Sequence, residues 1–354
     1  MDSKITSGGN INKWFSLGIV LNEETYIEYT LKSIYDFFEQ IIIVEGATQF
    51  ALDVSPEGLS TDRTAEIIRD FPDPENKIVF RQVGWVPSKR ELRNMALRMA
   101  NINQGDCFMI QDYDEVWKPE DYVAIDNHFK DPQLHYLFTN FVQVFGDFQH
   151  MEDTDARKQT KDPLTTRTDD TVARARSPER AVRFFPGMNF ISHVNVSDVF
   201  NRFVYEHPLY KQHRVKDFSI GFWHYGYVHP LDRVVTKRAY YARQDRQEDN
   251  NPISLMQNVL GEWHTNYCRT GKDKIIVPIT MEHPEIMKSH PYYGKDLQEV
   301  TDPEGVWGNL NDQEFLQRAV QLCNKATASQ CPENIIKLTV AAQTDSNVYR
   351  KPNE

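Results

Sequence analysis

The sequence predicts an α/β fold in which helices flank a mostly parallel, Rossmann-like sheet. Three observations in the first third of the chain predict it. Short apolar runs recur, a segment with one apolar helical face follows each of the early runs, and the spacing matches repeated strand–helix–strand units. Units of this kind join neighbouring parallel strands through right-handed crossovers.

The first unit shows the pattern. Residues 14–21 (WFSLGIVL) suit a buried strand, and Asn22 is expected to cap the next helix, with Glu23 in its first turn. Apolar side chains then recur at spacings of four, three and four, which gives that helix one apolar face: Ile27, Leu31, Ile34 and Phe38. The next strands and helices are expected in alternation at 41–44, 60–71, 77–83 and 88–100.

The fourth predicted strand ends in a concentration of acid. The stretch 106–117, DCFMIQDYDEVW, passes from apolar residues directly to Asp112, Asp114 and Glu115. Like charges this close repel one another, and at a half-buried strand end this repulsion is costly unless a cation binds there. Ligands of parallel sheets bind at the carboxyl ends of the strands, which is where these acids lie. A solvated acidic turn is the simpler alternative.

Other polar residues are expected at the same edge of the sheet. Asn22 and Glu23 follow the first strand, Glu45 follows the second, and Lys89 and Arg93 lie on the helix after the third. Oxygen ligands beside basic side chains suit a divalent cation together with a phosphate-bearing ligand, and hard oxygen ligands favour magnesium or manganese. The basic residues alone are equally typical of a solvated helix face.

The order and spacing of several segments resemble family-2 glycosyltransferases of the GT-A fold. These segments are FSLGIVLNEETYIEYTLKSI, IIIVEGA, STDRT, RNMALRMANINQGDCFMIQDYDEVW, ERAVRFFPGMNFISHVNVSDVF (with His193) and FWHYGYVHPLDRVVTKRAYYARQ. The similarity covers roughly residues 14–243. One departure is the acidic turn after the second strand, which is split here into 45–48 and 60–64 by an insertion of about a dozen residues.

The resemblance implies an inverting transferase that uses a nucleotide-diphosphate sugar, most commonly a UDP-sugar, together with Mn²⁺ or Mg²⁺. Asp114 and His224 are the implied metal ligands, and Asp112 is expected to face the ribose or the donor sugar. Glu45 is the candidate for the nucleoside and Arg93 for the diphosphate. The implied donor-binding residues are Asn22, Glu23, Glu45, Asp62, Arg93 and Asp112.

Inverting members of the family also use a carboxylate base that deprotonates the acceptor hydroxyl. The pair Glu152 and Asp153 is the better placed candidate, because it follows the apolar run 134–148. Glu248 and Asp249 are the second candidate pair. The charged stretch that begins at Glu152 is also typical of a solvated loop.

We expect a catalytic domain over 1–243 that contains a mobile polar loop at 150–180. Residues 244–354 are expected to form a helical extension with a polar tail, including helices near 254–263 and 315–326. This extension is a candidate contact for a homo-oligomer. The acceptor is not identified by the sequence.

Composition limits the classes of function. A formal net charge of −11 over 354 residues does not indicate a nucleic-acid partner, which needs a basic surface. The four cysteines are scattered without a CxxC pair, which predicts neither a disulfide framework nor a zinc site and fits the cytoplasm. We also expect no membrane span, since no run of 18 apolar residues occurs.

Two other classes of protein fit part of the pattern. The letters Asp112-Tyr113-Asp114-Glu115-Val116 match the motif of haloacid-dehalogenase-type phosphatases, although that motif normally ends the first strand rather than the fourth. A non-catalytic module that binds a nucleotide sugar on the same fold is the other alternative. A nucleotidyltransferase is disfavoured, because no Gly-rich loop follows the first strand.

Overall fold

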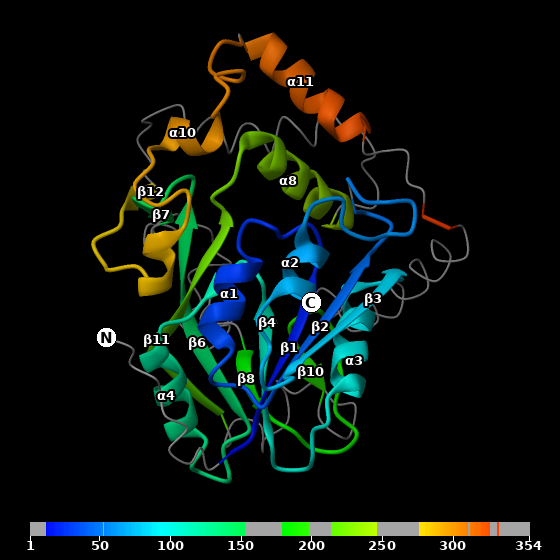
Figure 1. Ribbon diagram of the computed structural model, residues 1–354, viewed down its shortest axis with the longest axis vertical. Helices are drawn as coiled ribbons and strands as arrows, with labels where there is room; N and C mark the ends of the chain where they lie inside the picture. The colour runs from blue at the N-terminus through cyan, green and yellow to red at the C-terminus, as the bar shows by residue number, and fades with distance from the viewer. Residues whose placement is uncertain are drawn as a thin grey trace, which may run out of the picture.

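A computed structural model describes residues 12–51, 53–152, 179–197, 214–245, 276–310, 312–325 and 331–332. Its centre is a mostly parallel sheet with helices on both faces (Figure 1). The parallel strands lie in the order β3, β2, β1, β4, with bounds Ile78–Trp85, Gln40–Ala47, Trp14–Val20 and Cys107–Asp112. The predicted α/β fold, with a mostly parallel, Rossmann-like sheet flanked by helices, is confirmed.

Antiparallel and long-range pairings extend the sheet beyond β4. Strand β8 (Glu179–Arg183) runs antiparallel to β4 and to β6 (Tyr136–Phe145). Strand β11 (Arg214–Tyr227) lies parallel to β6 and antiparallel to the short β5 (Glu115–Val116). The remaining short strands are β7 (His150–Glu152), β12 (Ile276–Pro278), β9 (Asn189–Phe190) and β10 (Val196–Ser197). The strands β6 and β11 therefore bring two distant segments beside the acidic end of β4.

Two apolar layers hold the sheet. One face packs against α1 (Ile27–Ile34), α2 (Thr64–Asp70) and α4 (Pro119–His128), and the other packs against α3 (Lys89–Met99). The strands between these layers are buried on both faces, and burial of each large apolar side chain contributes about 1.5–3 kcal/mol. The boundaries of α3 agree with the predicted helix, whose N-cap Ser88 accepts a hydrogen bond from the Glu91 N–H.

The first helix begins later than the sequence predicts, because Asn22 does not cap it. The backbone of Asn22 is left-handed, with φ of +51°. Its side chain instead holds a neighbouring loop: Nδ2 donates to the Asp53 carbonyl at 2.6 Å, and Oδ1 accepts from the Thr61 N–H at 2.8 Å. Helix α1 consequently starts only at Ile27, and Glu23 lies before it in the loop.

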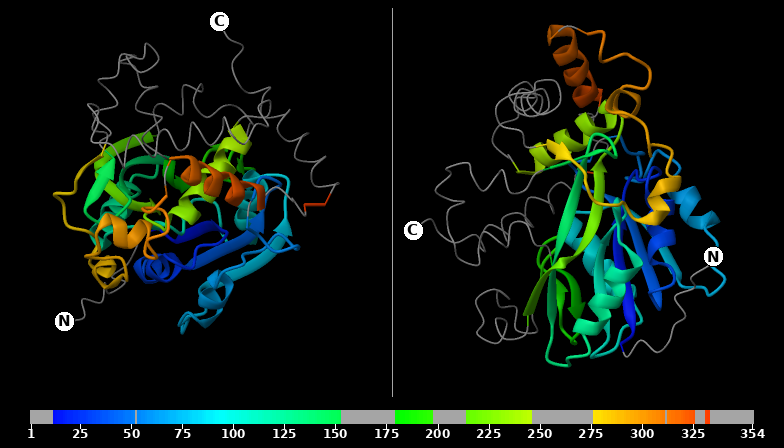
Figure 2. Two further views of the ribbon diagram at one scale, coloured as in Figure 1. Left: turned by 90° about the horizontal axis from the view of Figure 1, so that it is seen from above. Right: turned by 90° about the vertical axis from the view of Figure 1, so that its left-hand side faces the viewer.

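The C-terminal part packs on the sheet domain at one end of the molecule (Figures 1 and 2). Helix α11 (Asp312–Lys325) lies against α8 (Leu231–Asp245), and α11 overlaps the helix predicted near 315–326. In chain order, the 3₁₀ helix η2 (Glu285–Ser289) and α10 (Leu297–Thr301) lie between α8 and α11. None of the helices within the described ranges has both the length and the apolar character that a bilayer crossing demands.

Two predicted segments fall largely outside the described residues. The polar loop expected at 150–180 has strands at both of its ends, since 150–152 belong to β7 and 179–180 to β8, and residues 153–178 lie outside the description. The helix expected at 254–263 also lies outside it. The division at 243/244 stays a prediction.

Candidate functional site

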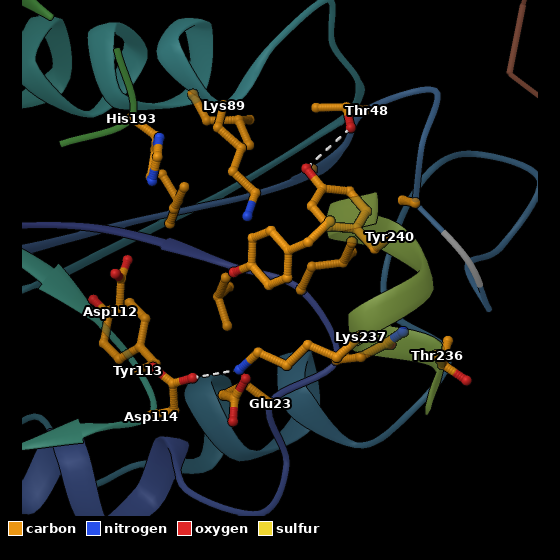
Figure 3. Close-up of a pocket in the computed structure, with 18 of the residues that line it drawn as sticks. Glu23, Thr48, Lys89, Asp112, Tyr113, Asp114, His193, Thr236, Lys237 and Tyr240 are labelled. Atoms are coloured by element: carbon orange, nitrogen blue, oxygen red, sulfur yellow. Dashed lines mark hydrogen bonds and ion pairs between the residues drawn. The ribbon is translucent and has the colours of Figure 1, made fainter. Parts of the chain in front are cut away.

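A cavity lies at the edge of the sheet where the sequence predicted the acidic residues. It opens at the carboxyl ends of β1, β2 and β4, and one face of α8 forms its opposite wall (Figure 3). Its volume is about 190 Å³, more than ten times the roughly 10–15 Å³ that a single water needs, so it can hold a ligand. The polar side chains in its lining are Asn22, Glu23, Thr48, Lys89, Asp112, Tyr113, Asp114, His193, His224, Arg233, Thr236, Lys237, Tyr240 and Tyr241.

Helix α8 contributes residues that the sequence analysis did not select. Arg233, Thr236, Lys237 and Tyr240 recur at spacings of three, one and three, which places them on one helical face. The opposite face is apolar and packs against α11 and its neighbours. This pattern was the signal available in the sequence. The four residues carry two positive charges and no negative one, whereas a solvated helix face usually carries charges of both signs.

Asp112 is held by two arginines. Its carboxylate forms an ion pair with Arg93 and lies 3.6 Å from Nη2 of Arg180. Arg180 is itself fixed by an ion pair with the buried Glu115. Burial alone would raise the pKa of Asp112, but the two guanidinium groups outweigh burial and hold that pKa below its usual value. Asp112 is therefore a fixed, ionised acceptor at the edge of the cavity.

Asp114 faces a different set of partners. Oδ2 lies 2.7 Å from Nζ of Lys237 and 3.4 Å from Nε2 of His224, so the structure brings the two predicted metal ligands together. His224 is oriented through its other ring nitrogen, which lies 2.8 Å from Oε1 of Gln143. Burial would raise the pKa of Asp114, but Lys237 and His224 lower it well below the usual range.

The surroundings of Asp114 fit a cation. Asp114, His224 and Lys237 converge on the backbone of Gly226, where an added Cβ would lie 2.5 Å from both Oδ2 of Asp114 and Nζ of Lys237. Within the described part of the chain, no three His, Cys, Asp or Glu side chains converge on one point. A hard cation that takes most of its ligands from water and phosphate, as Mg²⁺ does, fits this pair of protein ligands.

Arg93 lies beneath the cavity rather than in it. Its side chain is fully buried and donates to the carbonyls of Leu17, Gln111 and His193 as well as to Asp112. Four of the five N–H donors of the guanidinium are thus taken up by β1, by the end of β4 and by the loop at His193. This arrangement supports a positioning role for Arg93, which is not among the residues that line the cavity.

The split acidic turn is rejoined in space. The Ser60 N–H donates to Oε1 of Glu45 at 2.8 Å, and Ser60 Oγ accepts from the Asn22 N–H at 2.8 Å. Gln82 donates to the other oxygen of Glu45 at 2.8 Å, so this fully buried carboxylate is satisfied by protein and is not among the residues that line the cavity. Asp62 accepts from the N–H groups of Glu24 and Thr64 and also lies outside the lining.

The wall opposite the two aspartates is aromatic and basic. Nζ of Lys89 lies 4.6 Å from the centre of the Tyr240 ring and 4.8 Å from that of Tyr241. The hydroxyls of Tyr240 and Thr48 lie 3.3 Å apart, and His193 lines the cavity beside Lys89 with an exposed side chain (Figure 3). Aromatic faces beside a lysine suit a planar base joined to a phosphate group.

The predicted base lies at the limit of the described residues. The backbone of Glu152 is in β7, where it pairs with Ile276 of β12. Asp153, Glu248 and Asp249 lie outside the described residues. The assignment of a base in either pair stays a prediction.

Comparison with known proteins gives similarity of structure. No family model and no curated protein sequence matches the chain. Among solved structures, glucosyl-3-phosphoglycerate synthase from Mycobacterium tuberculosis, in complex with Mn²⁺, UDP and glucosyl-3-phosphoglycerate, is 14% identical over 71% of this chain and 80% of that chain, with a TM-score of 0.38. S. aureus TarS 1-349 is 13% identical over 96% and 89%, with a TM-score of 0.37. At this level of similarity, the function is inferred from the chain's own residues.

Glu23 is a buried acid in the lining of the cavity. Its side chain is 10% exposed, and Oε1 has no hydrogen-bond partner within the described residues. Burial, reinforced by the negative charge of Asp114, raises the pKa of Glu23 to about 8. The folded protein therefore keeps a proton here that the unfolded chain releases near pH 4.5.

The sign of this linkage predicts that Glu23 destabilises the fold as pH rises from about 4.5 to about 8. We expect Glu23→Gln to remove this loss, which amounts to at most about 1.4 kcal/mol per pH unit. Urea unfolding at pH 5, 7 and 9, with chelator present, should show that the free energy of unfolding of the variant increases relative to that of the wild type as pH rises. Glu28→Gln, on the exposed surface of α1, is the control and should follow the wild type. A difference in the free energy of unfolding between Glu23→Gln and the wild type that stays the same at all three pH values would contradict the prediction.

Proposed function

We propose that this chain is a glycosyltransferase that moves a sugar from a nucleotide-diphosphate donor to an acceptor hydroxyl. The observation that supports this most is the cavity at the end of β4, where Asp112 and Asp114 face Lys89, Lys237 and tyrosines of α8. Carboxylates for a metal and sugar hydroxyls, cations for phosphate and aromatic faces for a base are together the groups that a nucleotide sugar needs. The family resemblance makes UDP the proposed nucleotide and inversion the proposed outcome.

The proposed roles follow from the contacts of each side chain. Asp112 is fixed by two arginines and accepts hydrogen bonds from hydroxyls of the ribose or the donor sugar. Lys89 and Arg233 line the same cavity and offer positive charge to the diphosphate. Asn22 and Glu23 shape the end of β1, where Arg233 donates to the carbonyl of Asn22. These contacts orient the donor before the bond to the sugar breaks.

A divalent cation is the proposed cofactor, held by Asp114 and His224. When bound, Mn²⁺ or Mg²⁺ would offset the negative charge that develops on the departing diphosphate. Glu152 or Asp153 is the proposed base for the acceptor hydroxyl. The metal site rests on the family resemblance together with the positions of Asp114 and His224 in the cavity, and the base rests on the resemblance and on its place after the apolar run 134–148.

Phosphatase chemistry fits the contacts of Asp112 less well. A haloacid-dehalogenase-type enzyme uses the first aspartate of the motif as a nucleophile. Here the carboxylate of Asp112 is already paired with Arg93 and lies near Arg180, which favours a fixed hydrogen-bond acceptor over an attacking group. The two functions make different predictions for phosphoester hydrolysis.

A thermal-shift screen tests the proposed donor. We expect UDP and UDP-sugars with Mn²⁺ to raise the melting temperature, with a stabilisation of about 2.7 kcal/mol at a hundredfold excess over the dissociation constant. UMP should stabilise much less, because it lacks the second phosphate that the lysines of the cavity would contact. The same samples should release UDP slowly from the preferred UDP-sugar.

Equal stabilisation by UMP and UDP, or by neither, would refute the proposed donor site. Rapid hydrolysis of simple phosphoesters without any response to nucleotides would favour the phosphatase. Binding of a UDP-sugar without any release of UDP, in the presence of a broad acceptor panel, would favour the non-catalytic module.

A further inference from the structure

The cation site at Asp114 already holds a positive charge. Nζ of Lys237 lies 2.7 Å from Oδ2 of Asp114, and the two side chains are only 15% and 8% exposed (Figure 3). A buried ion pair of this kind is retained because either partner alone would be an uncompensated buried charge. The lysine ammonium therefore satisfies Asp114 in the free protein.

A divalent ion and this ammonium compete for one place. Both would contact Oδ2 of Asp114, which is also the oxygen that faces His224 at 3.4 Å. The space on the Gly226 side is closed, since even a methyl group there would approach Oδ2 and Nζ to 2.5 Å. Two cations side by side would also repel each other strongly in a buried site. Metal binding at Asp114 thus requires that Lys237 move.

Lys237 needs another anion before it can leave. Its side chain is only 15% exposed, so movement without a new partner would leave a poorly solvated, unpaired charge. A flexible four-carbon stem lets a lysine turn between neighbouring anions. A diphosphate in the cavity would supply negative charge within reach of a side chain that already lines it.

We propose that Lys237 closes the cation site in the free protein, and that a nucleoside diphosphate opens the site by drawing the Lys237 ammonium onto its phosphates. This inference rests on the proposed nucleotide-sugar function. It predicts that metal and nucleotide bind interdependently: each ligand raises the affinity for the other by the same factor. Lys237 would then contact both the metal ligand and the leaving group in turn.

The test measures manganese binding by the loss of the free Mn²⁺ signal in electron paramagnetic resonance, with and without UDP. For the wild type we expect weak binding of Mn²⁺ alone and at least roughly tenfold tighter binding with UDP, within the usual range of such couplings. Lys237→Met should bind Mn²⁺ alone at least roughly tenfold more tightly than the wild type and show little further gain with UDP. Lys237→Gln provides a second neutral variant should the methionine variant fold poorly.

Lys89→Met is the matched control. It removes a positive charge from the same cavity but from a lysine that does not contact Asp114, so its affinity for Mn²⁺ alone should stay within about threefold of the wild type. If Lys89→Met gained as much affinity for Mn²⁺ as the Lys237 variants, the gain would come from the general loss of positive charge in the cavity, and the proposal would be overturned.

The remaining outcomes separate the inference from the proposed function. Equal Mn²⁺ affinity in wild type and both Lys237 variants would overturn the inference even where UDP binds normally. Tight binding of Mn²⁺ alone by the wild type would also overturn it. A gain in the Lys237 variants without UDP binding in any protein would refute the donor and the coupling, while the competition at Asp114 would stand.

Discussion

Replacing Asp114 by asparagine is expected to lower the rate of sugar transfer by about a hundredfold to a thousandfold. The amide keeps the shape of the carboxylate but removes the charge that pairs with Lys237 and that a divalent ion would need. It also leaves the Lys237 ammonium buried beside a neutral group, so we expect a loss of stability as well as of activity. The measurements are UDP release from the preferred donor at saturating Mn²⁺ and urea unfolding of the same samples.

Asp36→Asn is the control for Asp114→Asn. Asp36 is an exposed aspartate just after α1 and outside the cavity lining, so its replacement should change neither the rate of UDP release nor the free energy of unfolding measurably. Activity of Asp114→Asn within a few-fold of the wild type would remove this residue from the reaction. Loss of stability without loss of turnover would show that the Asp114–Lys237 pair is structural only.

The part of the site that the sequence predicted depends on local patterns. Strands β1 to β4 are short apolar runs between amphipathic helices, and such runs can be recognised in the sequence without knowing which elements pack against them. Asp112 is the last residue of β4 and Asp114 lies just beyond it, so the rule that ligands bind at strand carboxyl ends places them correctly. His224 could be added only through the family resemblance.

The missed features depend on contacts between distant segments. Lys237 lies 123 residues from Asp114 in the chain, and only the packing of α8 over the sheet brings them together. Glu45 was assigned to a ligand by its position after the second predicted strand, and Arg93 through the family resemblance. Both side chains are instead buried and hydrogen-bonded to partners contributed by other elements, which no local pattern identifies.

Arg93 provides the second large expected effect, on the stability of the fold. We expect Arg93→Met to lower the free energy of unfolding by about 3–5 kcal/mol, because it leaves a carboxylate and three carbonyls without their donor. Two of those carbonyls belong to Leu17 in β1 and Gln111 in β4, so the loss falls where the parallel strands meet the cavity. Urea unfolding monitored by tryptophan fluorescence measures it.

Arg98→Met is the matched control, since Arg98 is exposed on the same helix and its replacement should change stability by less than about 0.5 kcal/mol. Arg93→Lys should fall between the two, because lysine keeps the charge but lacks the planar fork that reaches several acceptors at once. A direct diphosphate ligand would behave differently: Arg93→Met would then keep wild-type stability and lose UDP affinity. That pattern would contradict the structural role, since a guanidinium that already donates to His193, Asp112 and both strands holds the floor of the cavity in place.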